Sequence, residues 1–119
     1  MFDFLKLVAN FLPLCIKEIE WDGDSLIVSG DNWSFFTSSV WRVSRDKDML
    51  FACLDDQVNT RIEELVGLSV VNISWIVSDQ PIDPSLILSD GRRLDVFCSF
   101  RYEPWVMSLP NDNVYIGNS

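Results

Sequence analysis

Two segments of the chain repeat apolar residues at the spacing of one helix face. Residues 4–11 and residues 58–66 each carry large apolar side chains every three or four positions, which predicts an amphipathic helix in both. Asp55 or Asp56 stands where an N-cap residue would precede the second helix. Gly67 can end that helix in the left-handed conformation.

Alternating or β-branched runs bounded by turn residues predict strands in the rest of the chain. The runs are residues 16–21, 26–29, 33–37, 40–43, 69–77, 86–88, 94–100 and 105–107. Asp22-Gly23 and Asp90-Gly91 lie between such runs, and glycine supplies the positive φ that a short hairpin turn needs. The pattern predicts an α+β fold that is mostly β, with antiparallel meanders in one continuous or two facing sheets.

The order of these elements recurs along the chain. An ungapped alignment places residues 11–21 on residues 65–75, and gapped alignments place residues 25–29 on 85–89 and residues 41–43 on 105–107. The sequence therefore predicts one domain over residues 1–119, with two similar helix-plus-antiparallel-meander halves at about 1–50 and 51–110. The alternative is a chance similarity between two β meanders.

The length and composition agree with one folded domain. A chain of 119 residues can bury one core, whereas two separate cores would each be marginal. Hydrophobic residues make up 48% of the chain and include five Trp and eight Phe, which is too many for a disordered segment. We therefore expect the chain to fold on its own.

Acidic residues outnumber basic ones in this domain. The chain has 18 Asp and Glu against 9 Lys and Arg, for a net charge of −9. Such a surface repels nucleic acid and anionic lipid, so we expect neither as a partner. The same field speeds encounter with a basic partner by about 10- to 1000-fold at low salt. The alternative is that the acidity serves solubility alone.

The cysteines and the N-terminal segment bear on the compartment. Cys15, Cys53 and Cys98 are widely spaced among apolar neighbours, which predicts buried thiols rather than a disulfide framework. Residues 1–13 lack the basic start and the cleavage site of an export signal, and no apolar run approaches the roughly 18 residues of a membrane span. These features favour a cytoplasmic protein.

Most catalytic and metal chemistry lacks its usual residues here. The chain has no histidine, which removes the commonest general base, the commonest metal ligand and the Ser-His and Cys-His pairs. The cysteines show no C-x-x-C spacing, and no phosphate-binding glycine pattern occurs. We therefore predict no catalytic residue, metal or cofactor, and a protein that is not an enzyme.

Binding to another protein is better supported by the pattern of acids and aromatic residues. Glu18 and Glu20 share the strand face opposite Ile19, so both should point to solvent. Trp41 is a candidate exposed anchor because Trp is enriched in interface hot spots, although a core position is the alternative. The predicted partner-binding residues are Glu18, Glu20, Asp22, Asp24, Asp46, Asp48, Asp55, Asp56, Trp41 and Glu103.

Three short motifs carry a resemblance to a known family. They are Leu65-Val66-Gly67 before a strand, Leu88-Ser-Asp-Gly-Arg-Arg-Leu94, and Tyr102-Glu-Pro-Trp105. The chain resembles a family of small bacterial proteins of unknown function with duplicated β meanders and a Tyr-Glu-x-Trp element. Some of them are suspected immunity proteins of contact-dependent or polymorphic toxin systems. Residues 111–119 lack the Gly-Gly ending of that family.

The resemblance, the small size and the acidity together favour an immunity protein. Such a protein would bind and neutralise a cognate bacterial toxin, taken here to be a nuclease, by covering its basic active-site cleft. The first alternative is a housekeeping interaction or structural module with no toxin partner. The second is an enzyme that uses carboxylates alone, with Glu103 beside Pro104 and Trp105 as its candidate acid.

Overall fold

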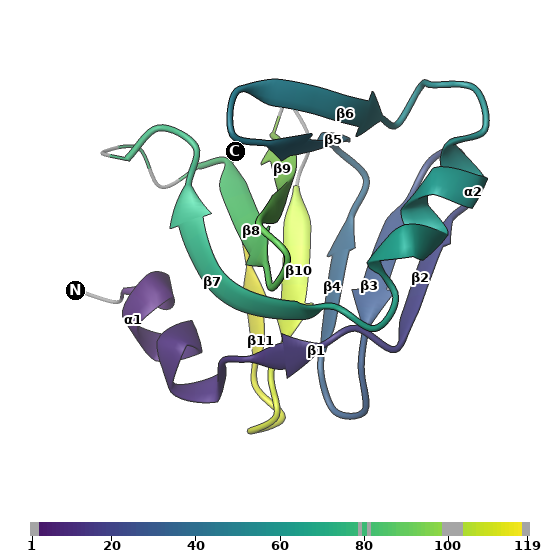
Figure 1. Ribbon diagram of the computed structural model, residues 1–119. Helices are drawn as coiled ribbons and strands as arrows, with labels where there is room; N and C mark the ends of the chain where they lie inside the picture. The colour runs from purple at the N-terminus through teal and green to yellow at the C-terminus, as the bar shows by residue number, and fades with distance from the viewer. Residues whose placement is uncertain (1–2, 79, 81, 99–103, 118–119) are drawn as a thin grey trace.

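The computed structural model describes residues 3–78, 80, 82–98 and 104–117. It is mostly β, with two antiparallel sheets and two short helices, as the sequence predicts. Figure 1 shows the helices α1 (Phe4–Val8) and α2 (Val58–Ile62) at opposite ends of the molecule. The duplication of the two halves stays a prediction.

The strands divide unevenly between the sheets. In spatial order, the six-stranded sheet contains β1 (Leu14–Cys15), β7 (Ser69–Trp75), β8 (Pro84–Leu88), β9 (Arg92–Phe97), β5 (Val40–Arg45) and β6 (Asp48–Ala52). The five-stranded sheet contains β11 (Val114–Ile116), β10 (Trp105–Ser108), β4 (Ser34–Thr37), β3 (Leu26–Ser29) and β2 (Glu18–Trp21). β7 is the longest strand, and it curves strongly around the molecule (Figure 1).

The chain crosses between the sheets at polar corners. Between β4 and β5, the Thr37 and Ser39 hydroxyls both donate to the Pro104 carbonyl, at 2.6 and 3.2 Å, so they tie that corner to the start of β10. Both side chains are buried, and their hydrogen bonds satisfy groups that could not reach water. Strands that switch sheets at such corners join two packed sheets into one body.

The first predicted strand, residues 16–21, forms as β2 over Glu18–Trp21. The sequence did not indicate that the chain changes sheets just before it, since Leu14–Cys15 form β1 of the other sheet. The crossing lies where the Ile16 N–H donates to the Leu68 carbonyl and the Lys17 N–H donates to the Ser29 carbonyl, both at 2.8 Å. The Ile16 carbonyl in turn accepts from the Gly67 N–H at 2.9 Å.

Both predicted helices form, and each continues into a 3-10 helix, η1 (Ala9–Phe11) and η2 (Glu63–Leu65). The Asp3 carboxylate caps α1 by accepting hydrogen bonds from the backbone N–H groups of Leu5, at 3.1 Å, and Lys6, at 3.3 Å. A carboxylate at this place satisfies N–H groups that have no partner within the helix.

The predicted cap of α2 is wrong. Gln57 precedes the helix in the left-handed conformation, with φ of 60°, and no side chain caps it. The Asp55 carboxylate instead accepts a hydrogen bond from the Ala52 N–H at 2.8 Å, closing the turn that follows β6. Gly67 has a φ of +96° after η2, as the left-handed ending requires.

Three edge strands, β1, β6 and β11, were not predicted. β6 reads Asp-Met-Leu-Phe-Ala, in which apolar residues do not alternate with polar ones. β11 has only three residues. Edge strands bury less of their side-chain surface than central ones, so their periodicity is weaker.

Among the described residues, none of the helices has the length and apolar character that crossing a membrane requires.

One hydrophobic core fills the space between the sheets. Trp41 and Trp105 are both buried in it, and each lies near a second tryptophan. The ring centroids of Trp21 and Trp41 are 5.4 Å apart in an edge-on arrangement, and those of Trp75 and Trp105 are 6.4 Å apart. Trp41 is 0% exposed, so the prediction that it binds a partner is wrong.

Candidate binding surface

The predicted acidic residues on β2 lie at the surface as expected. Ile19 points into the core while Glu18 and Glu20 are exposed on the opposite face of the strand. Both glutamates line a hollow of about 320 Å³ together with Lys17, Glu63 and Val66. Glu63 comes from η2, because α2 packs against β2. The structure thus adds Glu63, which the predicted set lacked.

Turn geometry fixes the acids that follow β2. The Asp22 carboxylate accepts hydrogen bonds from the backbone N–H of Ser25, at 2.6 Å, and of Asp24, at 2.8 Å. The Ser25 bond and then the Asp24 bond lower the pKa of Asp22, because both favour its ionised form. Asp22 therefore holds the β2–β3 turn, and the exposed Asp24 is the freer of the two charges.

Asp46 and Asp48 lie in the β5–β6 hairpin, at the β6 edge of the six-stranded sheet. Both are exposed, but basic residues flank them. Arg93 donates to the Asp46 carbonyl at 2.6 Å, and Arg45 ends β5 directly before the turn. The nearby guanidinium groups weaken the negative field of this hairpin.

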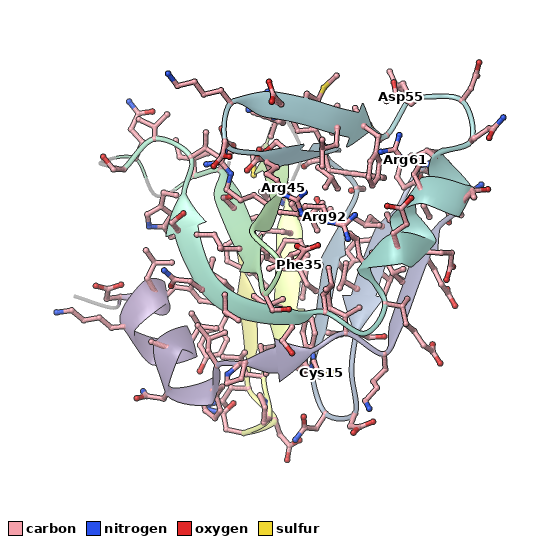
Figure 2. The ribbon with its side chains drawn as sticks, in the orientation of Figure 1. Cys15, Phe35, Arg45, Asp55, Arg61 and Arg92 are labelled. Atoms are coloured by element: carbon pink, nitrogen blue, oxygen red, sulfur yellow. The ribbon has the colours of Figure 1, made fainter. Side chains whose placement is uncertain are left out.

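Asp55 and Asp56 are exposed in the loop between β6 and α2, and Figure 2 shows Asp55 there. The Asp55 carboxylate already bonds the Ala52 N–H. Trp41, as described above, is buried, and Glu103 lies outside the described residues. The predicted residues therefore fall into separate groups, and Glu18 and Glu20 share a hollow with a further acid, Glu63.

Arginines neutralise a different set of carboxylates. Arg92 pairs with Asp90 at 2.7 Å and with Glu64 at 3.0 Å, and Arg45 pairs with Asp90 at 3.4 Å. Arg45 and Arg92 lie close together in Figure 2. Partial burial works to raise the pKa of Asp90, but the hydrogen bonds and charge of Arg92, with the charge of Arg45, hold it below its usual value.

The carboxylates of the β2 hollow contrast with this neutralised set. Within the described part of the chain, Glu18, Glu20 and Glu63 form no ion pair and accept no side-chain hydrogen bond. An unpaired carboxylate at the surface attracts a basic partner with its full negative charge. In a paired one, the bound guanidinium cancels part of that attraction. We define these three residues as the acidic hollow.

A buried polar cluster on the outer face of the six-stranded sheet is fully satisfied. Asp95 accepts hydrogen bonds from the hydroxyls of Ser85, at 2.7 Å, and Ser44, at 2.9 Å, and from Arg42 Nε at 3.1 Å. Asp95 and both serines are buried. Because the Asp95 carboxylate and both serine hydroxyls have hydrogen-bond partners within the fold, we interpret the cluster as structural. Among the described residues, no group of three or more Asp, Glu and Cys is placed to hold a metal ion.

The thiols differ from the prediction in one case. All three cysteines are free, but Cys15 is exposed, whereas Cys53 is buried and Cys98 is partly buried. Burial, with the nearby Asp83 carboxylate, raises the pKa of Cys98 to about 12.

Comparison of the chain with protein-family models, curated proteins and solved structures found no match.

We expect iodoacetamide at pH 8 to alkylate Cys15 well before Cys98 in the native protein. The thiolate is the reacting form, and a thiol with a pKa of about 12 holds almost none at that pH. Peptide mapping by mass spectrometry over time measures both rates, and reaction in urea provides the control in which the difference disappears. Equal native rates would contradict the expectation.

Proposed function

We propose that this chain is a cytoplasmic immunity protein that binds one cognate bacterial toxin, a nuclease, and covers its basic active-site cleft. The acidic hollow carries the proposal, because its three carboxylates face solvent without an ion pair among the described residues. A cleft that holds nucleic acid is basic, and carboxylates presented to it use the field that would hold phosphates. The proposal assigns no catalytic role to the chain.

We also propose that the chain contains two similar halves, and the order of elements supports this. Each helix has five residues and is followed by a 3-10 helix of three. The neighbours run β2-β3-β4-β10-β11 in one sheet and β7-β8-β9-β5-β6 in the other. The two orders become the same when β2 to β6 are exchanged for β7 to β11.

The proposed match bears on the acidic hollow. The alignment of residues 11–21 on 65–75 places Glu18 on Asn72 and Glu20 on Ser74. The matching strand, β7, therefore forms with uncharged residues at both positions. If the halves correspond, the fold does not require carboxylates on this strand, and the charge of β2 is available for a partner.

Binding to the product of the adjacent upstream gene tests the proposed function. We expect the two proteins to co-purify and the chain to protect cells that express the toxin. Replacing both Glu18→Gln and Glu20→Gln should slow association about 3- to 10-fold at low salt and weaken its salt dependence. Stopped-flow or surface plasmon resonance at several salt concentrations measures both effects.

The matched control changes the same number of charges elsewhere. Asp46→Asn with Asp48→Asn, in the hairpin beside Arg45 and Arg93, should alter association less than the β2 pair. A gene neighbourhood without a toxin, together with no rescue of cells from any toxin, would contradict the proposal. Binding that does not respond to salt would instead favour a housekeeping interaction module.

A further inference from the structure

A continuous line of apolar side chains crosses the outer face of the five-stranded sheet. Ile27 lies opposite Phe36, Phe36 opposite Val106, and Val106 opposite Ile116. Residues directly opposite each other in antiparallel strands point to the same face. We call these four residues the apolar row. Ile27 is 37% and Ile116 is 49% exposed, while Phe36 and Val106 are partly buried.

This composition is unusual for the wet face of an antiparallel sheet. The opposite face, with Leu26, Phe35 and Met107, packs into the core, so the outer face should be polar. The adjacent cross-strand row meets that expectation, since it contains Glu18, Ser29, Ser34 and Ser108 before Val114. The apolar row spans three strand spacings, about 14 Å. It is therefore a continuous apolar surface across four strands rather than one isolated exposed side chain.

The six-stranded sheet offers an internal comparison. Its cross-strand row through Ile87 continues to Asn72 on one side and to Arg93 and Ser44 on the other. Polar side chains therefore interrupt the outer face of that sheet, although both sheets have the same inward packing. Among the described residues, the exposure of the apolar row shows that no helix or loop covers it.

Charge identifies the kind of occupant. The row meets β2 at Glu20, which lies directly opposite Ile27, so it continues into the acidic hollow without a break. A net charge of −9 opposes the close approach of a second copy of the chain and favours a basic partner. A protein with an apolar centre and a cationic rim matches both parts of this surface.

We propose that the apolar row, with Glu20 at its end and Glu18 beside it on β2, is the docking surface for a basic protein, and this rests on the proposed function that such a toxin is the partner. The apolar row forms the water-excluding centre of the contact. The acidic hollow forms its charged edge and sets the orientation. Centre and edge should act on different rate constants, because apolar contacts govern dissociation and rim charges govern association.

The test uses the intact chain and the product of the adjacent upstream gene as the probe. A variant with Ile27→Ser, Val106→Ser and Ile116→Ser should raise the dissociation constant by at least about 10-fold, mainly through faster dissociation. The matched control replaces exposed apolar residues elsewhere, Leu54→Ser, Val71→Ser and Val77→Ser, and should leave binding within about 2-fold. Circular dichroism and thermal unfolding check that both variants fold.

A single change covers the case in which the triple variant does not fold. Ile116→Arg adds a positive charge at the most exposed position of the row, on an edge strand, so it should weaken binding of a basic partner while the protein stays folded. Sedimentation of the wild-type chain alone should give a monomer.

The possible failures are distinguishable. Toxin binding that neither the triple variant nor Ile116→Arg weakens would overturn the docking surface and leave the proposed function standing. A wild-type dimer that Ile116→Arg dissociates would also overturn it, because the row would then be a self-association surface. No binding of the wild-type chain to the toxin would overturn both proposals together.

Discussion

Replacing Trp41 by alanine is expected to lower the free energy of unfolding by about 3 to 5 kcal/mol, the usual cost of removing a buried aromatic side chain. Trp41 is fully buried, and its ring meets those of Trp21, at 5.4 Å, and Phe51, at 6.3 Å, both edge-on. Folded domains are stable by about 5 to 15 kcal/mol, so the loss would be a large share of the total. Urea denaturation followed by circular dichroism measures it.

Trp41→Phe is the matched control for this prediction. The indole N–H of Trp41 has no hydrogen-bond partner among the described residues, so its stabilising effect comes from packing rather than from a hydrogen bond. Phenylalanine keeps most of the ring contact and should cost less than alanine. A loss below about 1 kcal/mol for Trp41→Ala would show that the core does not depend on this contact.

Replacing Asp95 by alanine should lower the free energy of unfolding by about 2 to 4 kcal/mol, because it leaves buried donors without an acceptor. The Ser44 and Ser85 hydroxyls both donate to this carboxylate, and both serines are buried. Each stranded polar group keeps its desolvation cost without its hydrogen bond. Thermal or urea unfolding of the variant measures the loss.

Two variants separate the roles within the Asp95 cluster. Arg42→Met removes the ion pair to Asp95. The Arg42 side chain is 40% exposed but that of Asp95 only 4%, so the loss should be about 1 to 2 kcal/mol, more than for a surface pair and less than for a fully buried one. Asp95→Asn keeps the volume and one acceptor oxygen, so it should fall between Arg42→Met and Asp95→Ala. An Arg42→Met loss equal to that of Asp95→Ala would contradict the assignment of the stability to the serine hydrogen bonds.

Local signals explain why the helices and hairpin turns could be predicted. A helix face depends on residues three and four apart, so the helices in residues 4–11 and 58–66 can be predicted without tertiary information. Gly23 and Gly91 adopt φ of 95° and 92°, which glycine does at little steric cost. The caps were less predictable, because Asp3 and Asp55 both favour caps and turns, and only the chain path decides between them.

The candidate surface depended on information that no local pattern carries. Leu26-Ile27-Val28 is apolar at every position and Phe35 is followed by Phe36, so alternation does not tell which residue faces the core. Register decides it, by placing Ile27, Phe36 and Val106 in one line on the outer side. Trp41 is a different case: it shares a strand face with Val43, and the polar Arg42 and Ser44 lie on the other face, so alternation itself favoured the core position that the structure shows.

The sequence by itself determined a mostly β domain with two short helices, a strongly negative surface, and carboxylates on one face of β2. These properties follow from spacing along the chain and from summed charge, which do not depend on where distant segments lie. Only the tertiary structure decided that β1 and β2 belong to different sheets. It also decided that, among the described residues, arginines pair with Asp90 and Glu64 but not with Glu18 and Glu20, and that an apolar row extends from Glu20. The reason is physical: sheet membership, ion pairing and the choice of inner face come from contacts between residues far apart in sequence, and many pairings satisfy the same local pattern.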